Sequence, residues 1–272
     1  AVIKRNGPHH NIFQRSTCKR KTEYCHLITL DPTILILMLI TLTTSTVAGV
    51  FGFGGGMLLI AALPGFLPAA ALIPVHSAIQ LLSNTSRAAL SWRDIHWQFA
   101  AQHALGSLIG IGLVALALFN VSLTYIPLMI GLYIMLNTWS GQFQRLVGKL
   151  DSFYMIGAVQ TGVGLMVGAP GPLPLPLLLR RLNDQHQIVC TMAIFMTTGH
   201  ILKLIIFVAA GFAFSDYWLE ILMMVAVAIG GSFLGTHWRQ KINATQFEWV
   251  IKLLLTVLAL LAIFRALSEL YT

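Results

Sequence analysis

Long apolar runs separated by short polar connections fill the chain from about residue 33 to residue 267. The runs lie at about 33–50, 57–73, 74–90, 98–118, 122–139, 151–167, 172–179, 187–212, 217–236 and 246–267. A helix needs about 20 apolar residues to cross the hydrocarbon core of a bilayer. Because eight of these ten runs approach that length, the pattern predicts an all-α membrane protein, a polytopic helical bundle with eight full-length spans.

The second and seventh runs are too broken to be straight spans. Pro64, Pro68 and Pro74 interrupt the second run, and the seventh lies in the proline-rich stretch 168–181. Proline removes a backbone donor and blocks the carbonyl four residues earlier. An unpaired backbone group in lipid costs several kcal/mol, so such segments survive only inside protein or beside a water-filled cavity. We therefore expect two broken or re-entrant helices in the interior.

Similar segments relate the two halves of the chain. Gly56 and Gly171 are 115 positions apart, and the Gly-Ser-x-x-Gly segments 106–110 and 231–235 are 125 positions apart. Small residues at such spacing let helix backbones approach closely. The pattern predicts a basic N-terminal tail, residues 1–32, followed by two transmembrane repeats, residues 33–140 and 151–267. Chance similarity between apolar segments is the alternative.

Composition excludes a soluble domain. The chain is 57% hydrophobic and 10% charged, with a mean hydropathy of +0.79, whereas soluble domains carry roughly 25% charged residues. Its net charge of +8 does not indicate a nucleic-acid partner, because six of the seventeen basic residues lie in the first 21 positions and most others at the ends of runs. That distribution is typical of membrane topology, so the chain is expected to lie in a membrane, in contact with lipid; the bacterial inner membrane is what the family resemblance described below implies.

Basic residues also predict the orientation of the spans. They mark four connections as cytoplasmic, at Arg93, at Arg145 and Lys149, at Arg180 and Arg181, and at Arg239 and Lys241. The third run then ends in the cytoplasm while its counterpart, the eighth, leaves it. This predicts inverted repeats, which in secondary transporters enclose a substrate site near the midplane. The C-terminus is predicted outside. The side of the N-terminus stays open: the basic tail favours the cytoplasm, whereas strict inversion of the two repeats favours the opposite side.

A glycine-rich segment follows the first run. Gly52, Gly54, Gly55 and Gly56 expose bare backbone just before an apolar helix that starts near Met57. Amide groups at the N-terminus of a helix suit an anion. Tight helix packing is the other interpretation of these glycines.

This segment belongs to a larger resemblance. The sequence GFGGG at 52–56, Pro64, the polar helix SAIQLLSNTSRAAL at 77–90 and the internal repeat resemble the sulfite exporter TauE/SafE family over roughly residues 33–267. The resemblance implies export or uptake of sulfite, organosulfonates such as sulfoacetate, or related small sulfur oxyanions. The second half departs from the family pattern, because GAPGP at 168–172 replaces the usual glycine run.

Charges within spans are costly, so each is a functional candidate. Arg87 ends the third run and Lys203 lies within the eighth, in nearly equivalent repeat positions. A guanidinium binds an oxyanion through two parallel hydrogen bonds, and a lysine adds a point charge. Extension of Arg87 to the cytoplasmic interface is the alternative. The remaining predicted substrate ligands are Gly54, Gly55, Gly56, Asn84, Gly168, Gly171, Thr197, Thr198 and His200.

Histidines within the runs raise the question of proton coupling, because imidazole titrates near neutral pH. His200 lies three residues before Lys203 on one helix face and is the first candidate, and His76 is the second. His103 is expected to be structural.

Other functions remain as alternatives. Glycine-lined backbone also builds channel filters, so an anion channel is the main rival. An intramembrane enzyme is not expected, because no run carries histidines or carboxylates at metal-binding spacing. The cysteines and histidines of the tail match no standard zinc pattern, so we expect neither metal nor cofactor. The sequence does not decide between a monomer and a homodimer.

Overall fold

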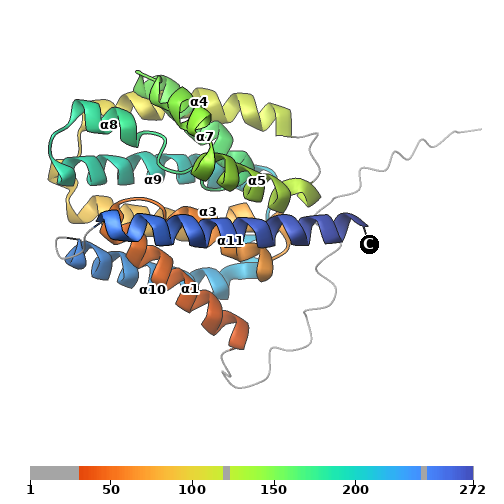
Figure 1. Cartoon of the computed structure of the whole chain (residues 1–272). Coiled ribbons are helices and arrows are strands. Elements are labelled where there is room, and N and C mark those ends of the chain that lie inside the picture. The colour runs from red at the N-terminus through yellow and green to blue at the C-terminus, as the bar shows by residue number, and fades with distance from the viewer. Residues whose placement is uncertain (1–30, 119–122, 240–243, 272) are drawn as a thin grey trace, which may run out of the picture.

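The computed structural model describes residues 31–118, 123–239 and 244–271, which contain eleven α-helices and no strand (Figure 1). The predicted tail, residues 1–32, lies almost entirely outside the described residues. The helices are α1 (Pro32–Phe51), α2 (Gly55–Ala62), α3 (Ala69–Leu90), α4 (Trp97–Leu118), α5 (Ile126–Trp139), α6 (Gly141–Gly148), α7 (Phe153–Val167), α8 (Leu175–Arg181), α9 (Gln185–Ala209), α10 (Trp218–Trp238) and α11 (Ala244–Tyr271).

Every predicted run is largely helical, which confirms the all-α membrane fold. The expected break at Pro74 is wrong, because α3 begins at Ala69, within the second run, and continues through Pro74. The expected number of eight full-length spans is too high, because only five of the described helices are long and apolar enough to cross a membrane. Helices α5 and α7 have 14 and 15 residues, and the 22-residue α3 is not among the five. Helix α6 was not predicted. It begins after Ser140, whose hydroxyl accepts a hydrogen bond from the Phe143 amide at 3.1 Å, as an N-cap does.

Glycines allow two helix pairs to pack backbone against backbone. A Cβ atom added at Gly106 or Gly110 of α4 would overlap the Tyr154 or Ala158 carbonyl of α7. Likewise, a Cβ added at Gly231 of α10 would lie 2.6 Å from the Leu42 carbonyl oxygen of α1. The prediction that the Gly-Ser-x-x-Gly segments permit close helix approach is confirmed.

The same contacts give the direction of each helix. Positions rise together along α4 and α7, from Gly106 with Tyr154 to Gly110 with Ala158, so these two helices are parallel. Helices α1 and α10 are also parallel, and Arg239 after the end of α10 donates to the Gly49 carbonyl near the end of α1 at 2.7 Å. Helix α1 therefore begins at the end of the bundle far from Arg239, the end at which α11 finishes (Figure 1).

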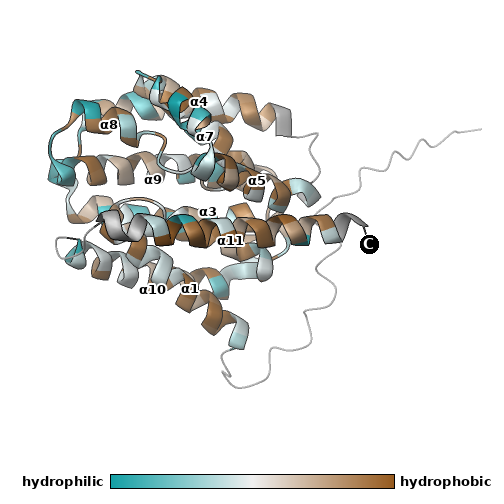
Figure 2. Ribbon diagram, viewed as in Figure 1, coloured by the Kyte–Doolittle hydropathy of each residue, from teal (hydrophilic) through white to brown (hydrophobic). Residues whose placement is uncertain are grey.

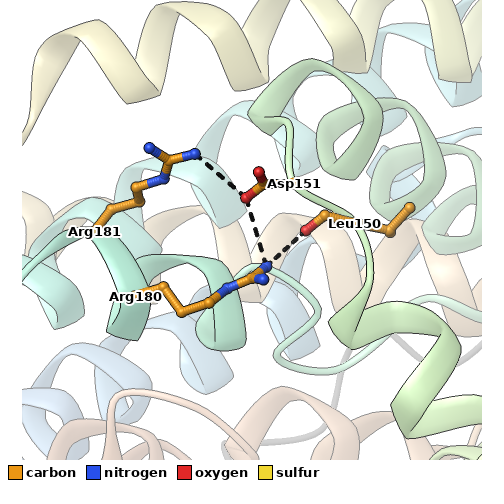
Figure 3. A network of polar contacts seen from close by, with 4 residues as sticks. All are labelled: Leu150, Asp151, Arg180 and Arg181. Carbon is orange, nitrogen blue, oxygen red and sulfur yellow. Dashed lines mark hydrogen bonds and ion pairs between the residues drawn. The ribbon is translucent and has the colours of Figure 1, made fainter.

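Helix α7 begins at the opposite end, where α8 finishes. Arg181 forms an ion pair with Asp151 at 3.3 Å, and Arg180 donates to the Leu150 carbonyl at 2.9 Å (Figure 3). Polar residues gather at this end of the bundle, whereas apolar residues colour the flanks of α1 and α11 (Figure 2). Exposed side chains such as Leu113 and Phe264, at 65% and 71% exposure, face outward, as expected of surfaces in lipid.

Candidate functional site

Two broken segments provide the backbone of the site. Helix α1 ends at Phe51, and Gly52 and Gly54 have φ values of 81° and 87° before α2 begins. Helix α7 ends at Val167, and Gly168 and Gly171 both have a φ of 79°. Only glycine adopts this region readily, so these four glycines let the chain reverse inside the bundle.

The two segments meet around a central cavity of about 60 Å³. Nine of the residues predicted as ligands or proton carriers line it: Gly54, Gly56, His76, Asn84, Arg87, Gly168, Gly171, His200 and Lys203. The other three do not. Thr197 and Thr198 donate to the Ala193 and Ile194 carbonyls of their own helix at 2.9 and 3.0 Å, and Gly55 packs against α1.

Arg87 points into the protein. Its side chain is 5% exposed, donates through Nη1 to the Ala48 carbonyl at 2.8 Å and through Nη2 to Oδ1 of Asn84. The Gly52 amide also donates to the Ala48 carbonyl, at 2.8 Å. Arg87 therefore does not extend to the cytoplasmic interface, the alternative that its position near Arg93 left open.

Lys203 occupies the corresponding place in the second half. It is 3% exposed, and its Nζ donates to the Gly168 carbonyl at 2.6 Å. Each cation thus binds a carbonyl where the broken helix of its own half ends, at the negative end of the helix dipole. Within the described residues, neither cation forms an ion pair with a carboxylate.

Two histidines face the same cavity. His76 donates from Nε2 to the Gly56 carbonyl at 2.9 Å, which leaves Nδ1 as an acceptor. The Nδ1 atoms of His76 and His200 are buried and have no hydrogen-bond partner among the described residues. Their ring centroids lie 5.7 Å apart.

Several lining residues were not predicted, chiefly Gln80, Gln160 and Phe53. Gln80 precedes Asn84 by four residues and Arg87 by seven. That spacing on one face of an otherwise apolar helix could have revealed it. Oε1 of Gln160 accepts a hydrogen bond from His103 Nε2 at 2.8 Å. Its Nε2 donates to the Gly171 carbonyl at 3.4 Å. His103 itself lies outside the cavity lining.

A second, larger cavity of about 1170 Å³ opens at the end of the bundle that carries the basic connections. We call it the vestibule. It is lined by residues from the ends of α1, α5 and α8, from α6, and from the starts of α9 and α11. The vestibule and the central cavity share Gly52, Phe53, Gly54 and Met57, which lie between them and which we call the neck.

The central cavity therefore suits a small anion. Two buried cations, amide side chains and bare glycine backbone line it, and no aspartate or glutamate of the described residues does. No group of three histidine, cysteine, aspartate or glutamate side chains able to hold a metal ion occurs among the residues described.

Comparisons with known proteins point to one family. No curated protein and no solved structure matches the chain. The sequence profile described as "Sulfite exporter TauE/SafE" matches residues 37–262, which include both broken segments and both buried cations. The chain belongs to the sulfite exporter TauE/SafE family of membrane transporters.

Proposed function

We propose that the protein is a secondary transporter that moves sulfite, an organosulfonate such as sulfoacetate, or a related small sulfur oxyanion across the bacterial inner membrane. The observation that carries this proposal is the pair of buried cations, Arg87 and Lys203, facing one cavity with no carboxylate in its lining. Burying a charge without a counter-ion is costly, and a bound anion would offset that cost.

The cavity has room for a small ion. Its volume of about 60 Å³ is several times the roughly 10–15 Å³ that a cavity needs to hold one water molecule. A bound oxyanion would accept hydrogen bonds from Lys203 and Arg87, from the Asn84 amide and from backbone amides at Gly54 and Gly56. The start of α2 adds the positive end of a helix dipole.

Alternating access between inverted repeats is the mechanism that we propose. Supporting it, each half contributes one broken helix whose terminal carbonyl binds one buried cation. In addition, α1 packs in parallel on α10 as α7 packs on α4, so each broken helix lies against the other half. Rocking one half against the other would expose the cavity first at one membrane face and then at the other.

Proton coupling is part of the same proposal. His200 and His76 face the cavity with unpartnered Nδ1 atoms, and imidazole changes charge near neutral pH. We expect anion flux to vary with pH between about 5.5 and 7.5, and His200→Gln to flatten that profile. An unchanged profile in this variant would exclude His200 as the proton carrier.

Flux into proteoliposomes tests the proposed function. Sulfite, thiosulfate and sulfoacetate should compete for one saturable, gradient-coupled pathway, whereas an organic cation should not compete. Preference for the cation would refute anion transport. Flux that rises linearly with concentration and ignores imposed gradients would instead favour an anion channel.

A further inference from the structure

The vestibule is lined by charges of one sign. Arg239, which follows α10, and Lys252 of α11 are the two charged residues in its described lining, and both are cationic. Four amide side chains add hydrogen-bonding groups: Asn137, Gln144, Asn183 and Gln185. The described walls are therefore positive or neutral. The vestibule is also far larger than a sulfite-sized ion requires.

Arg239 also links the vestibule to the central cavity. Its Nε and Nη2 donate to the Gly49 carbonyl at 3.1 and 2.7 Å, while Arg87 donates to the preceding carbonyl, that of Ala48. Two guanidinium groups thus bind consecutive carbonyls of α1. Arg239 lines the vestibule and Arg87 lines the central cavity.

We propose that the vestibule is a second anion site, in which Arg239 and Lys252 collect a sulfur oxyanion before it passes the neck to Arg87 and Lys203. This inference rests on the proposed transport function. A recess with walls of low dielectric constant and one sign of charge concentrates counter-ions and raises their rate of association by about 10- to 1,000-fold. The basic connections at this end make it cytoplasmic, so the site would load anions for export.

The chemistry of the walls also suggests which anions it accepts. Apolar residues such as Leu173, Val189 and Met192 line the vestibule beside its cations. A sulfonate with a short carbon chain could place its charged oxygens at Arg239 and its carbon atoms against this apolar wall. The vestibule should therefore accept organosulfonates as well as inorganic sulfur oxyanions.

Arg239 could instead serve only to cap the end of α1, and the variants must separate these roles. Arg239→Lys keeps the charge but loses the two-donor contact to Gly49, whereas Arg239→Gln removes the charge. Lys252→Gln removes a vestibule charge from a different helix. Arg93→Gln is the matched control, because Arg93 is an exposed cation on the η3 turn (Trp92–Asp94) outside the vestibule lining.

The experiment measures sulfite flux by the full chain in oriented proteoliposomes, with sulfite added at the cytoplasmic face at two salt concentrations. Arg239→Gln and Lys252→Gln should each raise KM by about tenfold, leave the maximal rate within about twofold, and weaken the dependence of KM on salt. Arg239→Lys, which keeps the charge, should raise KM less than Arg239→Gln does, and Arg93→Gln should behave like the wild type.

Two results would overturn the inference. The first is a KM and salt dependence in Arg239→Gln and Lys252→Gln equal to those of Arg93→Gln. The second is an equal rise in KM in Arg239→Lys and Arg239→Gln with an unchanged KM in Lys252→Gln. That result would mean that Arg239 only caps the end of α1. Wild-type flux in the same vesicles tests the proposed function separately. If the wild type shows saturable sulfite flux and either of these two results is obtained, only the proposed vestibule site is refuted. A wild type that neither transports nor binds sulfite, thiosulfate or sulfoacetate would refute both proposals.

Discussion

At the scale of single residues, the proposed binding step replaces carbonyl oxygens with oxyanion oxygens as the partners of the two buried cations. In the structure, Ala48 and Gly168 supply carbonyl oxygens to Arg87 and Lys203. A carbonyl dipole stabilises a cation less than a full negative charge does in a medium of low dielectric constant. We therefore expect an arriving oxyanion to compete favourably for the donors of Arg87 and Lys203.

Loss of the lysine charge should weaken anion binding strongly. We expect Lys203→Ala to raise the Kd for sulfite by about 30-fold or more, equivalent to about 2 kcal/mol or more, because the anion loses a buried cationic partner. Calorimetric titration of the detergent-purified protein measures this. Lys149→Ala, which removes an exposed lysine, should bind like the wild type, and equal affinity in both variants would contradict a ligand role for Lys203.

Arg87 tests geometry as well as charge. Its guanidinium holds Ala48 and Asn84 at once, and a lysine cannot reproduce that planar fork. Arg87→Lys should therefore lower sulfite flux by about tenfold or more, although the charge is retained. The corresponding exchange at an exposed site, Arg93→Lys, should leave flux unchanged. Wild-type affinity and flux in Arg87→Lys would show that charge alone suffices at this position.

At the scale of helices, the bundle depends on two backbone-to-backbone contacts, between α4 and α7 and between α1 and α10. Glycine is unfavourable within a helix, so its presence at Gly106, Gly110, Gly231 and Gly235 reflects packing. These contacts join each broken helix to a long helix of the other half. Movement of one half against the other would have to preserve or slide along them.

Two glycines of α4 separate packing from helix propensity. A methyl group at Gly110 would overlap the Ala158 carbonyl, whereas Gly112 has no neighbour within 4 Å of an added Cβ. Gly110→Ala should destabilise the protein by about 1–3 kcal/mol through overpacking, while Gly112→Ala should be neutral or slightly stabilising. Thermal unfolding in detergent compares the two. Equal transition temperatures would mean that α4 and α7 can separate without cost.

At the scale of the whole molecule, the structure bears on the side at which the chain begins. Helix α1 starts at the end of the bundle where α11 finishes, and the basic connections lie at the other end. From the positive-inside rule, we therefore expect both the start of α1 and the C-terminus to face outward. The parallel pairing of α1 with α10 accordingly favours an external start for α1, despite the basic tail before it.

Labelling of single cysteines tests this topology. In a variant whose own cysteines are replaced by serine, Asp31→Cys should react with an impermeant maleimide in intact cells. Gln142→Cys on α6 should react only after the cells are opened. A C-terminal reporter active only in the cytoplasm should stay silent. Protection of Asp31→Cys in intact cells would show that the predicted orientation of α1 is wrong. An active reporter would show the same for α11.

The sequence alone determined the class of protein and the apolar segments, and it marked Arg87 and Lys203 as the charges within them, although the burial of Arg87 was decided only by the structure. These features follow from local physics, because bilayer thickness sets the length of a span and a charge within a span is costly. Proline is a weaker guide, since Pro64 lies in the 3-10 turn that ends α2 but Pro74 lies inside α3. The residues Gly54, Asn84, Arg87 and Lys203 could therefore be identified from the pattern, and the structure brings them to one cavity.

The tertiary structure decided which groups meet. Thr197 and Thr198 share a helix with His200 and Lys203, yet their hydroxyls bond to their own helix and do not face the cavity. Arg239, which the sequence marks only as a cytoplasmic residue, binds a carbonyl 190 positions away. Helical periodicity predicts which residues share a face, but not which helix that face will meet. That choice depends on close glycine contacts between segments distant in sequence, so only the folded bundle reveals it.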